Sequence, residues 1–495
     1  MSFTTRPEIR GTFGVVTSTH WIASAVGMGI LERGGNAFDA AVATAITLQV
    51  VEPHLNGPAG DMPAIFQKAG EAVCGQGPAP AAATIEHYRA EGLTLIPGSG
   101  LLATVIPGAF DGWMLLLRDH GTFSLRDVLA PAIGYARDGH PILPRVANTI
   151  AGLADYFAEH WPSSAEVWTP GGAAPEAHAL FRNPDLARTY ERLVEAGEAA
   201  GDDRVAQIDA ARSEWRGGFV ADAVSDYLAE ANVMDVSETS HRGVLTREDM
   251  AGWQASYEDS LSYEYHGWTV HKTQAWGQGP VLLQALAILK HLDLAAMDPM
   301  GADFVHVVIE AIKLAYADRE AYYGDPAQSD IPMEYLLSDA YNADRAALIG
   351  ATASTDQRPG RVPGFAHLSD AYIARATRDF GVADAAPQEP TMAHLTEKRG
   401  DTVHIDVIDA AGNMVAATPS GGWLQSNPVI PGLGFPLNSR AQMFWLEQGL
   451  PSSLAPGRRP RTTLTPSLAE HHDGRRLVFG TPGGDQQDQW QLIWF

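Results

Sequence analysis

The stretch Arg399-Gly400-Asp401-Thr402-Val403-His404-Ile405-Asp406-Val407-Ile408-Asp409 marks a change in the character of the chain. A loose polar segment precedes it. From Val403 onward apolar side chains alternate with polar ones, which is typical of a half-buried strand. The sequence Ala-Ala-Gly-Asn at 410–413 predicts a turn, and residues 414–418 predict a returning strand. Thr402 is therefore expected at the start of a β-hairpin, directly after a flexible loop.

A threonine at this position has two interpretations. Thr is common in strands, and local sequence alone favours that structural interpretation. The alternative is that the Asp401–Thr402 bond is cut, so that Thr402 becomes an N-terminal residue with a hydroxyl nucleophile and its own amine as base. An α-amino group titrates near ~7.7–8.0, so much of it is neutral and able to accept the hydroxyl proton.

Six stretches distributed along the chain carry a shared pattern. They are VVEPHLNGPAGD (50–61), GVLTREDMAGW (243–253), EAIKLAYADREAYYGDP (310–326), GDTVHIDVIDAAGNMV (400–415), RRPRTTLTPSLA (458–469) and FGTPGGD (479–485). In this order and spacing they resemble the γ-glutamyltransferase family of N-terminal-nucleophile hydrolases, from about Gly14 to the last residue. In that family the threonine matching Thr402 is the nucleophile and the first residue of the small subunit.

The resemblance implies a fold and a division of the chain. Composition and pattern alone indicate only an α/β or α+β protein. The family implies an α+β fold, a four-layer αββα sandwich, with a helix-rich large subunit over 1–401 and a small subunit over 402–495. Residues 385–400 are then expected to be a processing tether across the active site. Because relatives continue past this point and the last residues are apolar, we expect the small subunit to be incomplete.

A glycine pair near the end of the chain is the candidate oxyanion site. Gly483 and Gly484 follow a predicted strand at 477–479 and precede a predicted helix, for which Asp485 is the expected cap. Adjacent amides at such a turn can stabilise an oxyanion. A plain turn and a phosphate loop are the alternatives, and the second is weak because no Lys-Ser/Thr follows the glycines. The resemblance assigns the oxyanion to both glycines, and it gives Ser420 a hydroxyl that orients the nucleophile.

The substrate pocket departs from the family pattern. An arginine that holds the donor carboxylate is replaced by Gln76, and two side chains that hold the amino group are replaced by Arg440 and Met443. A cation and a thioether do not bind an ammonium. Thr462 and Thr463 replace a serine pair, and their hydroxyls keep the ability to contact a carboxylate. Arg440 would suit an anionic substrate without the amine, held by a forked contact, unless it is a surface arginine.

Several functions remain open at this point. The first is a self-cleaving amide hydrolase or acyltransferase that acts on γ-glutamyl or related small amides, with water or an amine as acceptor and glutathione as the family's donor. The second is a hydrolase without γ-glutamyl specificity, like oxamate amidohydrolases and cephalosporin acylases. The third, of another class, is an unprocessed binding protein without catalysis. Two subunits from one precursor are expected, and a dimer of such heterodimers stays open.

The composition narrows the range of partners. A formal net charge of −25 argues against nucleic acid and anionic membranes. Cys74 is the only cysteine in the sequence, so an intramolecular disulfide and a thiolate metal cluster are excluded. No stretch reaches the ~20 apolar residues of a membrane helix, and the first residues do not resemble a signal peptide. We expect no metal, no organic cofactor and a cytoplasmic location.

Overall fold

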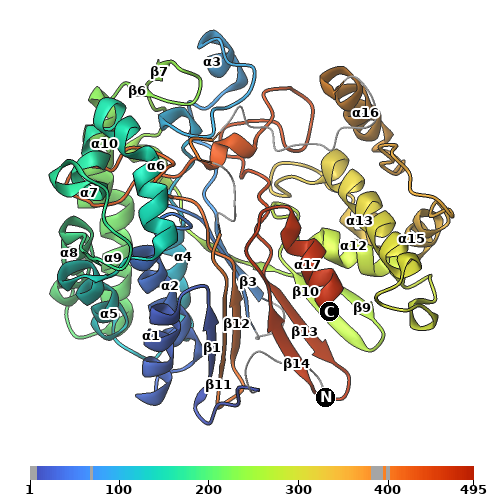
Figure 1. The fold of residues 1–495 in the computed structure, drawn as a ribbon, viewed down its shortest axis with the longest axis horizontal. Helices are drawn as coiled ribbons and strands as arrows, with labels where there is room; N and C mark the ends of the chain where they lie inside the picture. The colour runs from blue at the N-terminus through green and yellow to red at the C-terminus, as the bar shows by residue number, and fades with distance from the viewer. Residues whose placement is uncertain (1–7, 67–70, 381–393, 397–401) are drawn as a thin grey trace.

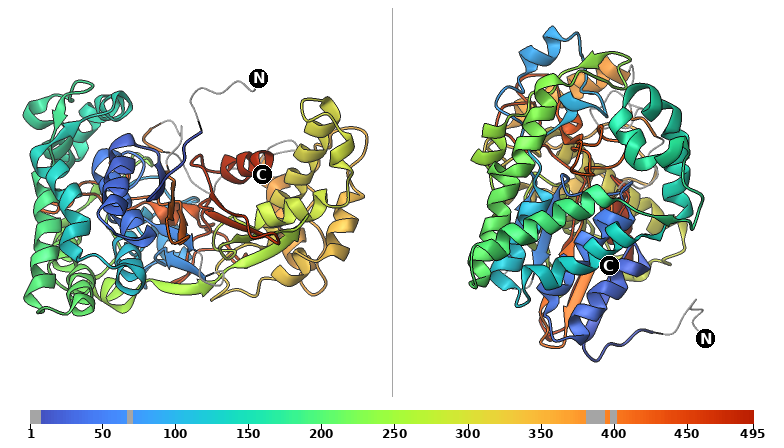
Figure 2. Two further views of the ribbon diagram at one scale, coloured as in Figure 1. Left: turned by 90° about the horizontal axis from the view of Figure 1, so that it is seen from below. Right: turned by 90° about the vertical axis from the view of Figure 1, so that its left-hand side faces the viewer.

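A computed structural model gives the fold of residues 8–66, 71–380, 394–396 and 402–495 (Figure 1). Two β-sheets face each other in the centre, and helices cover the outer face of each sheet. The left view of Figure 2 shows the same two groups of helices on opposite sides of the strands. The predicted four-layer αββα arrangement is confirmed. Asp401 and most of the predicted tether at 385–400 lie outside the described residues.

The first sheet has six antiparallel strands, and the hairpin after Thr402 lies inside it. The order is β1 (Gly14–Ser18), β11 (Ile405–Asp409), β12 (Met414–Ala417), β2 (Met62–Phe66), β3 (Glu71–Gly75) and β8 (Ser256–Asp259). Ile405 and Val407 are fully buried, as the alternation predicts. The strand begins at Ile405, later than expected, because Thr402 pairs only through an isolated bridge to Ser420.

One helical layer covers this sheet. It is built from α1 (Trp21–Glu32), α2 (Ala37–Val51), α4 (Ala109–His120), α5 (Leu125–Asp138), α6 (Pro144–His160), α7 (Pro162–Trp168), α8 (Pro184–Ala199), α9 (Arg204–Gly217), α10 (Phe219–Glu230) and α11 (Arg247–Gly252). The short α3 (Ile85–Ala90) lies apart and packs in a separate cluster with residues 441–454 (Figure 1). The side chain of Asn36 caps α2 in a reciprocal capping box with Asp39, and every residue of α2 is buried. Its uniformly apolar sequence predicts this burial.

The second sheet has four antiparallel strands in the order β14 (Arg476–Phe479), β13 (Ser467–His471), β10 (Trp268–Lys272) and β9 (Leu261–Tyr265). A single strand over 262–272 is the natural prediction from the sequence, and it is wrong. The chain turns at His266 and Gly267, whose φ angles of +47° and +84° are both left-handed, as tight hairpin turns require. The apolar positions change phase at this turn, from Tyr263 and Tyr265 to Trp268 and Val270, and the prediction of a single strand overlooks that signal.

A second helical layer covers this sheet, formed by α12 (Pro280–Leu289), α13 (Ala302–Tyr322), α14 (Met333–Leu336), α15 (Asp339–Ala346), α16 (Ala366–Phe380) and α17 (Gln486–Trp494). Lys272 of β10 is fully buried and ties α17 to the sheet. Its ammonium lies 3.2 Å from the Asp488 carboxylate and donates to Ser467 Oγ at 2.6 Å. Within the described ranges, no helix is both long and apolar enough to cross a membrane.

Two short two-stranded ladders complete the regular structure. They pair β4 (His140–Pro141) with β5 (Leu180–Phe181) and β6 (Val233–Met234) with β7 (Ser240–His241). A short 3-10 turn, η4 (Arg440–Met443), follows the first sheet in the chain and is buried throughout. It carries Arg440 toward the end of the β11–β12 hairpin at which Thr402 lies.

Candidate active site

The β11–β12 hairpin brings Thr402 and Ser420 together. Both residues are 1% exposed, and they form an antiparallel bridge just beyond the two strands. The Val403 amide donates to the Pro419 carbonyl at 3.1 Å, and the hydroxyl oxygens of Thr402 and Ser420 lie 3.3 Å apart. This is the contact that an orienting role of Ser420 requires. The other side of the predicted cleavage position, Asp401, lies outside the described residues.

Close backbone contact fixes the position of Ser420. A Cβ atom on Gly60 would lie 2.1 Å from the Ser420 carbonyl oxygen, and one on Gly57 would lie 2.2 Å from that of Gly422. Only glycine allows two backbones to approach this closely. The next residue, Asp61, exchanges two backbone hydrogen bonds with Ser420, at 2.7 and 3.1 Å. The segment 57–61 therefore holds the loop that carries the Ser420 hydroxyl.

Arg440 is buried in an ion pair with Asp61. The Arg440 Nε–H donates to Oδ2 of Asp61, and the guanidinium lies 5.1 Å from the centre of the Trp423 ring. The side chains of Arg440 and Asp61 are 4% and 0% exposed, so the alternative of a surface arginine is wrong. Burial raises the pKa of Asp61, and the neighbouring Arg440 charge opposes that shift.

The sequence alone assigns no role to Asp61, although this residue ends one of the six family stretches. A carboxylate directly before the fully buried strand β2 requires a cationic or hydrogen-bonding partner, and that requirement is a usable signal. The partner lies 379 residues away in the chain. Sequence reasoning identifies each side chain by type but gives no means of pairing them.

Gln76 and Thr462 contact each other. The Thr462 hydroxyl donates to Oε1 of Gln76 at 2.9 Å, and Nε2 of Gln76 donates to the Pro460 carbonyl. The Thr462 amide donates to the Trp276 carbonyl at 2.8 Å, and Thr463 is 4% exposed. Both ends of the Gln76 amide are thus used within the chain. Gln76 therefore suits the role of positioning the loop that carries Thr462 and Thr463.

The glycine pair forms a left-handed turn before α17. Gly483 has φ +127° and Gly484 has φ +58°, so both positions favour glycine. No described residue accepts a hydrogen bond from the amide of either glycine. Asp485 is at the N-cap position of α17, as expected, but its side chain makes no cap bond. Its carboxylate instead accepts from Arg319 Nη1 at 2.6 Å, and that guanidinium attracts it away from the helix end.

His404 links this turn to the strand that follows Thr402. Its Nδ1 lies 3.0 Å from Thr418 Oγ1 and its Nε2 lies 2.9 Å from Asp406 Oδ1. The imidazole packs against Gly480, the first residue after β14. His404 is also missed from the sequence, where it reads only as a polar residue in an alternating strand. His404 therefore couples the position of the turn at Gly483 and Gly484 to that of the segment that follows Thr402.

Other catalytic chemistries find little support in the described residues. Among them, no group of three or more His, Cys, Asp or Glu side chains is placed to hold a metal ion. Cys74 is buried, and burial raises the pKa of its thiol to about 12. A thiol with such a pKa is protonated at neutral pH and is a poor nucleophile.

Comparisons with known proteins agree with this arrangement. The sequence model described as Gamma-glutamyltranspeptidase matches residues 23–495. The glutathione hydrolase-like YwrD proenzyme of Bacillus subtilis (strain 168) is 29% identical, over 98% of this chain and 81% of its own length. The oxamate amidohydrolase proenzyme of Klebsiella pneumoniae subsp. pneumoniae is also 29% identical, with the same two shares, 98% and 81%.

Two solved structures extend the comparison to the fold. The structure described as LmbA2991T421A is 53% identical, with a TM-score of 0.90, over 99% of this chain and 82% of that chain. A cephalosporin acylase from Bacillus halodurans is 27% identical, with a TM-score of 0.80, over the same shares of 99% and 82%. The fold described above is therefore shared with these two solved structures.

Proposed function

The chain belongs to the γ-glutamyltranspeptidase family and is an N-terminal-nucleophile amidohydrolase, and we propose that Thr402 is its nucleophile and is exposed by self-cleavage. The Thr402 hydroxyl attacks the carbonyl carbon of Asp401, and the peptide C–N bond breaks as an ester forms. Water then hydrolyses the ester. This leaves a carboxyl terminus on Asp401, a free amine on Thr402, and two subunits over 1–401 and 402–495.

The mature site then acts on an external amide. The Thr402 amine takes the hydroxyl proton, and the oxygen attacks the substrate carbonyl. The amides of Gly483 and Gly484 stabilise the oxyanion, and the Ser420 hydroxyl orients the nucleophile. The leaving amine receives the proton as the C–N bond breaks. Water or an amine then attacks the acyl ester, which gives hydrolysis or transfer.

The substrates we propose are small amides, γ-glutamyl or related. Arg440 and the Thr463 hydroxyl supply donors on the acyl side, and Gln76 accepts from the Thr462 hydroxyl, whose oxygen lies on the same side as an acceptor. Relatives include enzymes named for glutathione hydrolysis, oxamate amidohydrolysis and cephalosporin acylation. The second candidate is a hydrolase without γ-glutamyl specificity. It is favoured by the replacement of both amino-group ligands of the family by Arg440 and Met443.

The observation that carries this proposal is the buried contact between the hydroxyls of Thr402 and Ser420 at the end of the hairpin. The test is a denaturing gel followed by N-terminal sequencing of the smaller band. We expect two bands, with Thr402 first in the small one, and a single band for Thr402→Ala. Thr377→Ala, at an exposed helical threonine, is the matched control and should be cut normally.

Activity separates the remaining alternatives. Release of p-nitroaniline from γ-glutamyl-p-nitroanilide, measured beside ammonia release from oxamate, distinguishes the two enzyme candidates. A single uncut band without turnover of any amide supports the binding protein without catalysis. A Thr402→Ala chain that is still cut at this bond contradicts the proposed nucleophile. So does an uncut wild-type chain that hydrolyses amides.

A further inference from the structure

The buried ion pair of Asp61 and Arg440 lies next to the nucleophile. Asp61 is bonded through its backbone to Ser420, whose hydroxyl lies 3.3 Å from that of Thr402. A Cβ atom on the following residue, Gly421, would lie 3.1 Å from Asp61 Oδ2 and 3.5 Å from Arg440 Nε. Both charges therefore lie against the residue that directly follows Ser420. A change of charge here acts on the immediate surroundings of the reacting atoms.

Asp61 is the ion-pair partner of Arg440 in the described part of the chain. Both side chains are almost completely removed from solvent, so water screens their charges weakly. Oδ1 of Asp61 and Nη2 of Arg440 have no hydrogen-bond partner among the described residues. The pair is thus neutral as a unit and retains unused acceptor capacity on Asp61 and unused donor capacity on Arg440.

The charge of this pair changes what the site selects. A lone guanidinium, as the sequence suggests, would favour an acyl group that ends in a carboxylate. A guanidinium already neutralised by a buried carboxylate does not, because the substrate anion would meet both charges at similar distances. A neutral pair instead suits an acyl group without net charge that presents a donor and an acceptor. A carboxamide fits, and so do the ammonium and carboxylate of an amino acid.

We propose that Asp61 is a specificity-determining residue, which neutralises Arg440 and thereby prevents the enzyme from preferring purely anionic acyl groups. This inference rests on the proposed function, because it takes Arg440 to face the acyl group that Thr402 attacks. Asp61 acts through Arg440 and through its place beside Ser420. If Asp61 had a purely structural role, its replacement would change kcat/KM for all substrates by the same factor. The proposed role instead changes the ratio of kcat/KM between anionic and neutral substrates.

The test uses two p-nitroanilides of the same shape. One is the glutaric acid monoanilide, which ends in a carboxylate, and the other is its carboxamide analogue. The measured quantity is the ratio of kcat/KM for the carboxylate to kcat/KM for the carboxamide. Because it is a ratio, it does not depend on the fraction of correctly folded or processed enzyme.

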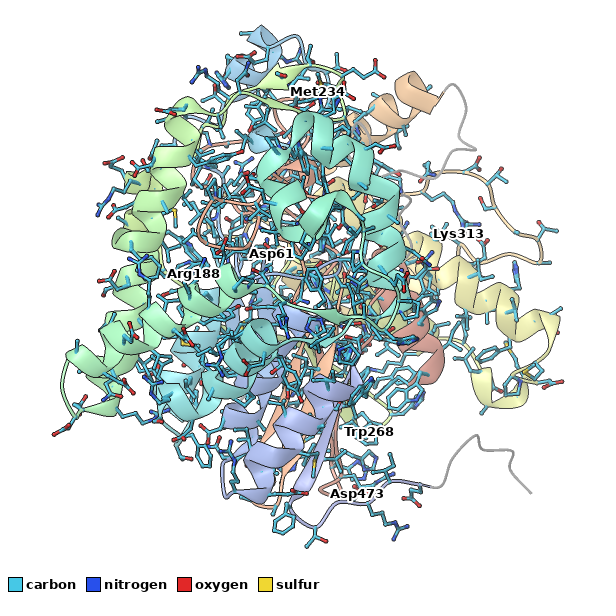
Figure 3. The ribbon with its side chains drawn as sticks, turned by 60° about the vertical axis from the view of Figure 1, so that its left-hand side comes forward. Asp61, Arg188, Met234, Trp268, Lys313 and Asp473 are labelled. Atoms are coloured by element: carbon cyan, nitrogen blue, oxygen red, sulfur yellow. The ribbon has the colours of Figure 1, made fainter. Side chains whose placement is uncertain are left out.

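The expected results form a charge cycle. Asp61→Asn keeps the shape and leaves Arg440 charged, so the ratio rises about tenfold or more. Arg440→Gln leaves Asp61 without its cation, so the ratio falls by a similar factor. The double variant removes both charges and is expected within about twofold of wild type. Asp473→Asn is the control, since Asp473 lies in an exposed turn at the edge of the molecule whereas Asp61 is interior (Figure 3).

The γ-glutamyl-p-nitroanilide of the same length distinguishes the two neutral classes. Wild-type preference for it over the carboxamide identifies the amino-acid headgroup, and the reverse preference identifies the carboxamide. A ratio that is unchanged in Asp61→Asn and in Arg440→Gln overturns the inference, as does an equal fall for both substrates. If wild-type protein is neither cut at Thr402 nor active on any of the anilides, the proposed function itself fails. Where one single variant does not fold, the other still decides the test, because each alone is expected to shift the ratio in a stated direction.

Discussion

A Cβ atom on Gly480 would lie 2.1 Å from Cε1 of His404, so the imidazole occupies the space that glycine leaves open. Gly480→Ala must therefore displace either the glycine turn or the strand that follows Thr402. We expect a loss of about 1–3 kcal/mol in the free energy of unfolding, as for other overpacked sites, together with a lower kcat. Urea unfolding and steady-state kinetics measure the two effects.

Two further variants test the cause of that loss. Gly29→Ala is a matched control, because this glycine lies inside α1 and a Cβ there meets no atom within 4 Å. It is expected to stabilise the protein by up to ~1 kcal/mol. The double variant Gly480→Ala with His404→Ser replaces the imidazole by a smaller side chain and should recover part of the stability. No recovery would contradict the steric explanation.

Ser420→Ala removes the hydroxyl that lies 3.3 Å from Thr402 Oγ1. The loss of one such hydrogen bond corresponds to about 1 kcal/mol, so we expect kcat and the rate of self-cleavage to fall by roughly fivefold with little change in KM. Ser420→Thr keeps the hydroxyl and should retain most of the activity if the added methyl group fits. An unchanged kcat in the alanine variant would remove Ser420 from the proposed mechanism.

Lys272→Met removes the buried cation that holds α17 on the second sheet. Asp488 is then left buried without its partner, because its carboxylate lies 3.2 Å from the ammonium of Lys272. Removal of one member of a buried pair typically costs about 3–5 kcal/mol. Thermal unfolding should show a large fall in Tm. Lys290→Met, at a 35% exposed side chain paired with Asp339, serves as the control and should cost less than ~1 kcal/mol.

Glu52 gives the protein a pH-dependent contribution to stability. Burial raises its pKa to about 7, although a hydrogen bond from the Thr19 hydroxyl and the charge of Arg145 oppose the shift. The folded state therefore binds the Glu52 proton more tightly than the unfolded state. The resulting stability is fully present below the ordinary glutamate pKa of about 4.5 and is lost as the pH rises through about 7.

The variant Glu52→Gln isolates this contribution. Its free energy of unfolding, relative to wild type, should increase between about pH 4.5 and 7, by an amount on the order of 3 kcal/mol. Burial also lowers the pKa of His20 and His54, to about 4 and about 3, which acts in the opposite direction. Those histidines are present in both proteins, so the difference between the curves is informative. Glu176→Gln at an exposed site should give parallel curves.

Local signals in the sequence predict much of this fold. The capping box of Asn36 and the uniformly apolar helix after it need only neighbouring residues, and the structure has both. The β11–β12 hairpin is predicted from alternation and an Ala-Ala-Gly-Asn turn. The four-layer assignment is different, because it comes from the family resemblance and not from the pattern of side chains.

Contacts between distant parts of the chain could not be predicted in this way. Asp485 is at the predicted N-cap position, but its carboxylate binds Arg319, which is remote in sequence, instead of the helix amides. Arg440 looks like a free cation until Asp61 is found beside it. The subunit division, the cytoplasmic location and the lack of a cofactor stay predictions.

The strand order of the first sheet has a consequence for how the two proposed pieces would behave. The β11–β12 hairpin lies between β1 and β2, both of which precede the cut. Opening the chain before Thr402 would leave the fragments interleaved, so that an affinity tag on either end would recover both. After complete denaturation the cut protein would have to reassemble from two molecules. Its recovery would then depend on protein concentration, whereas that of the uncut precursor would not.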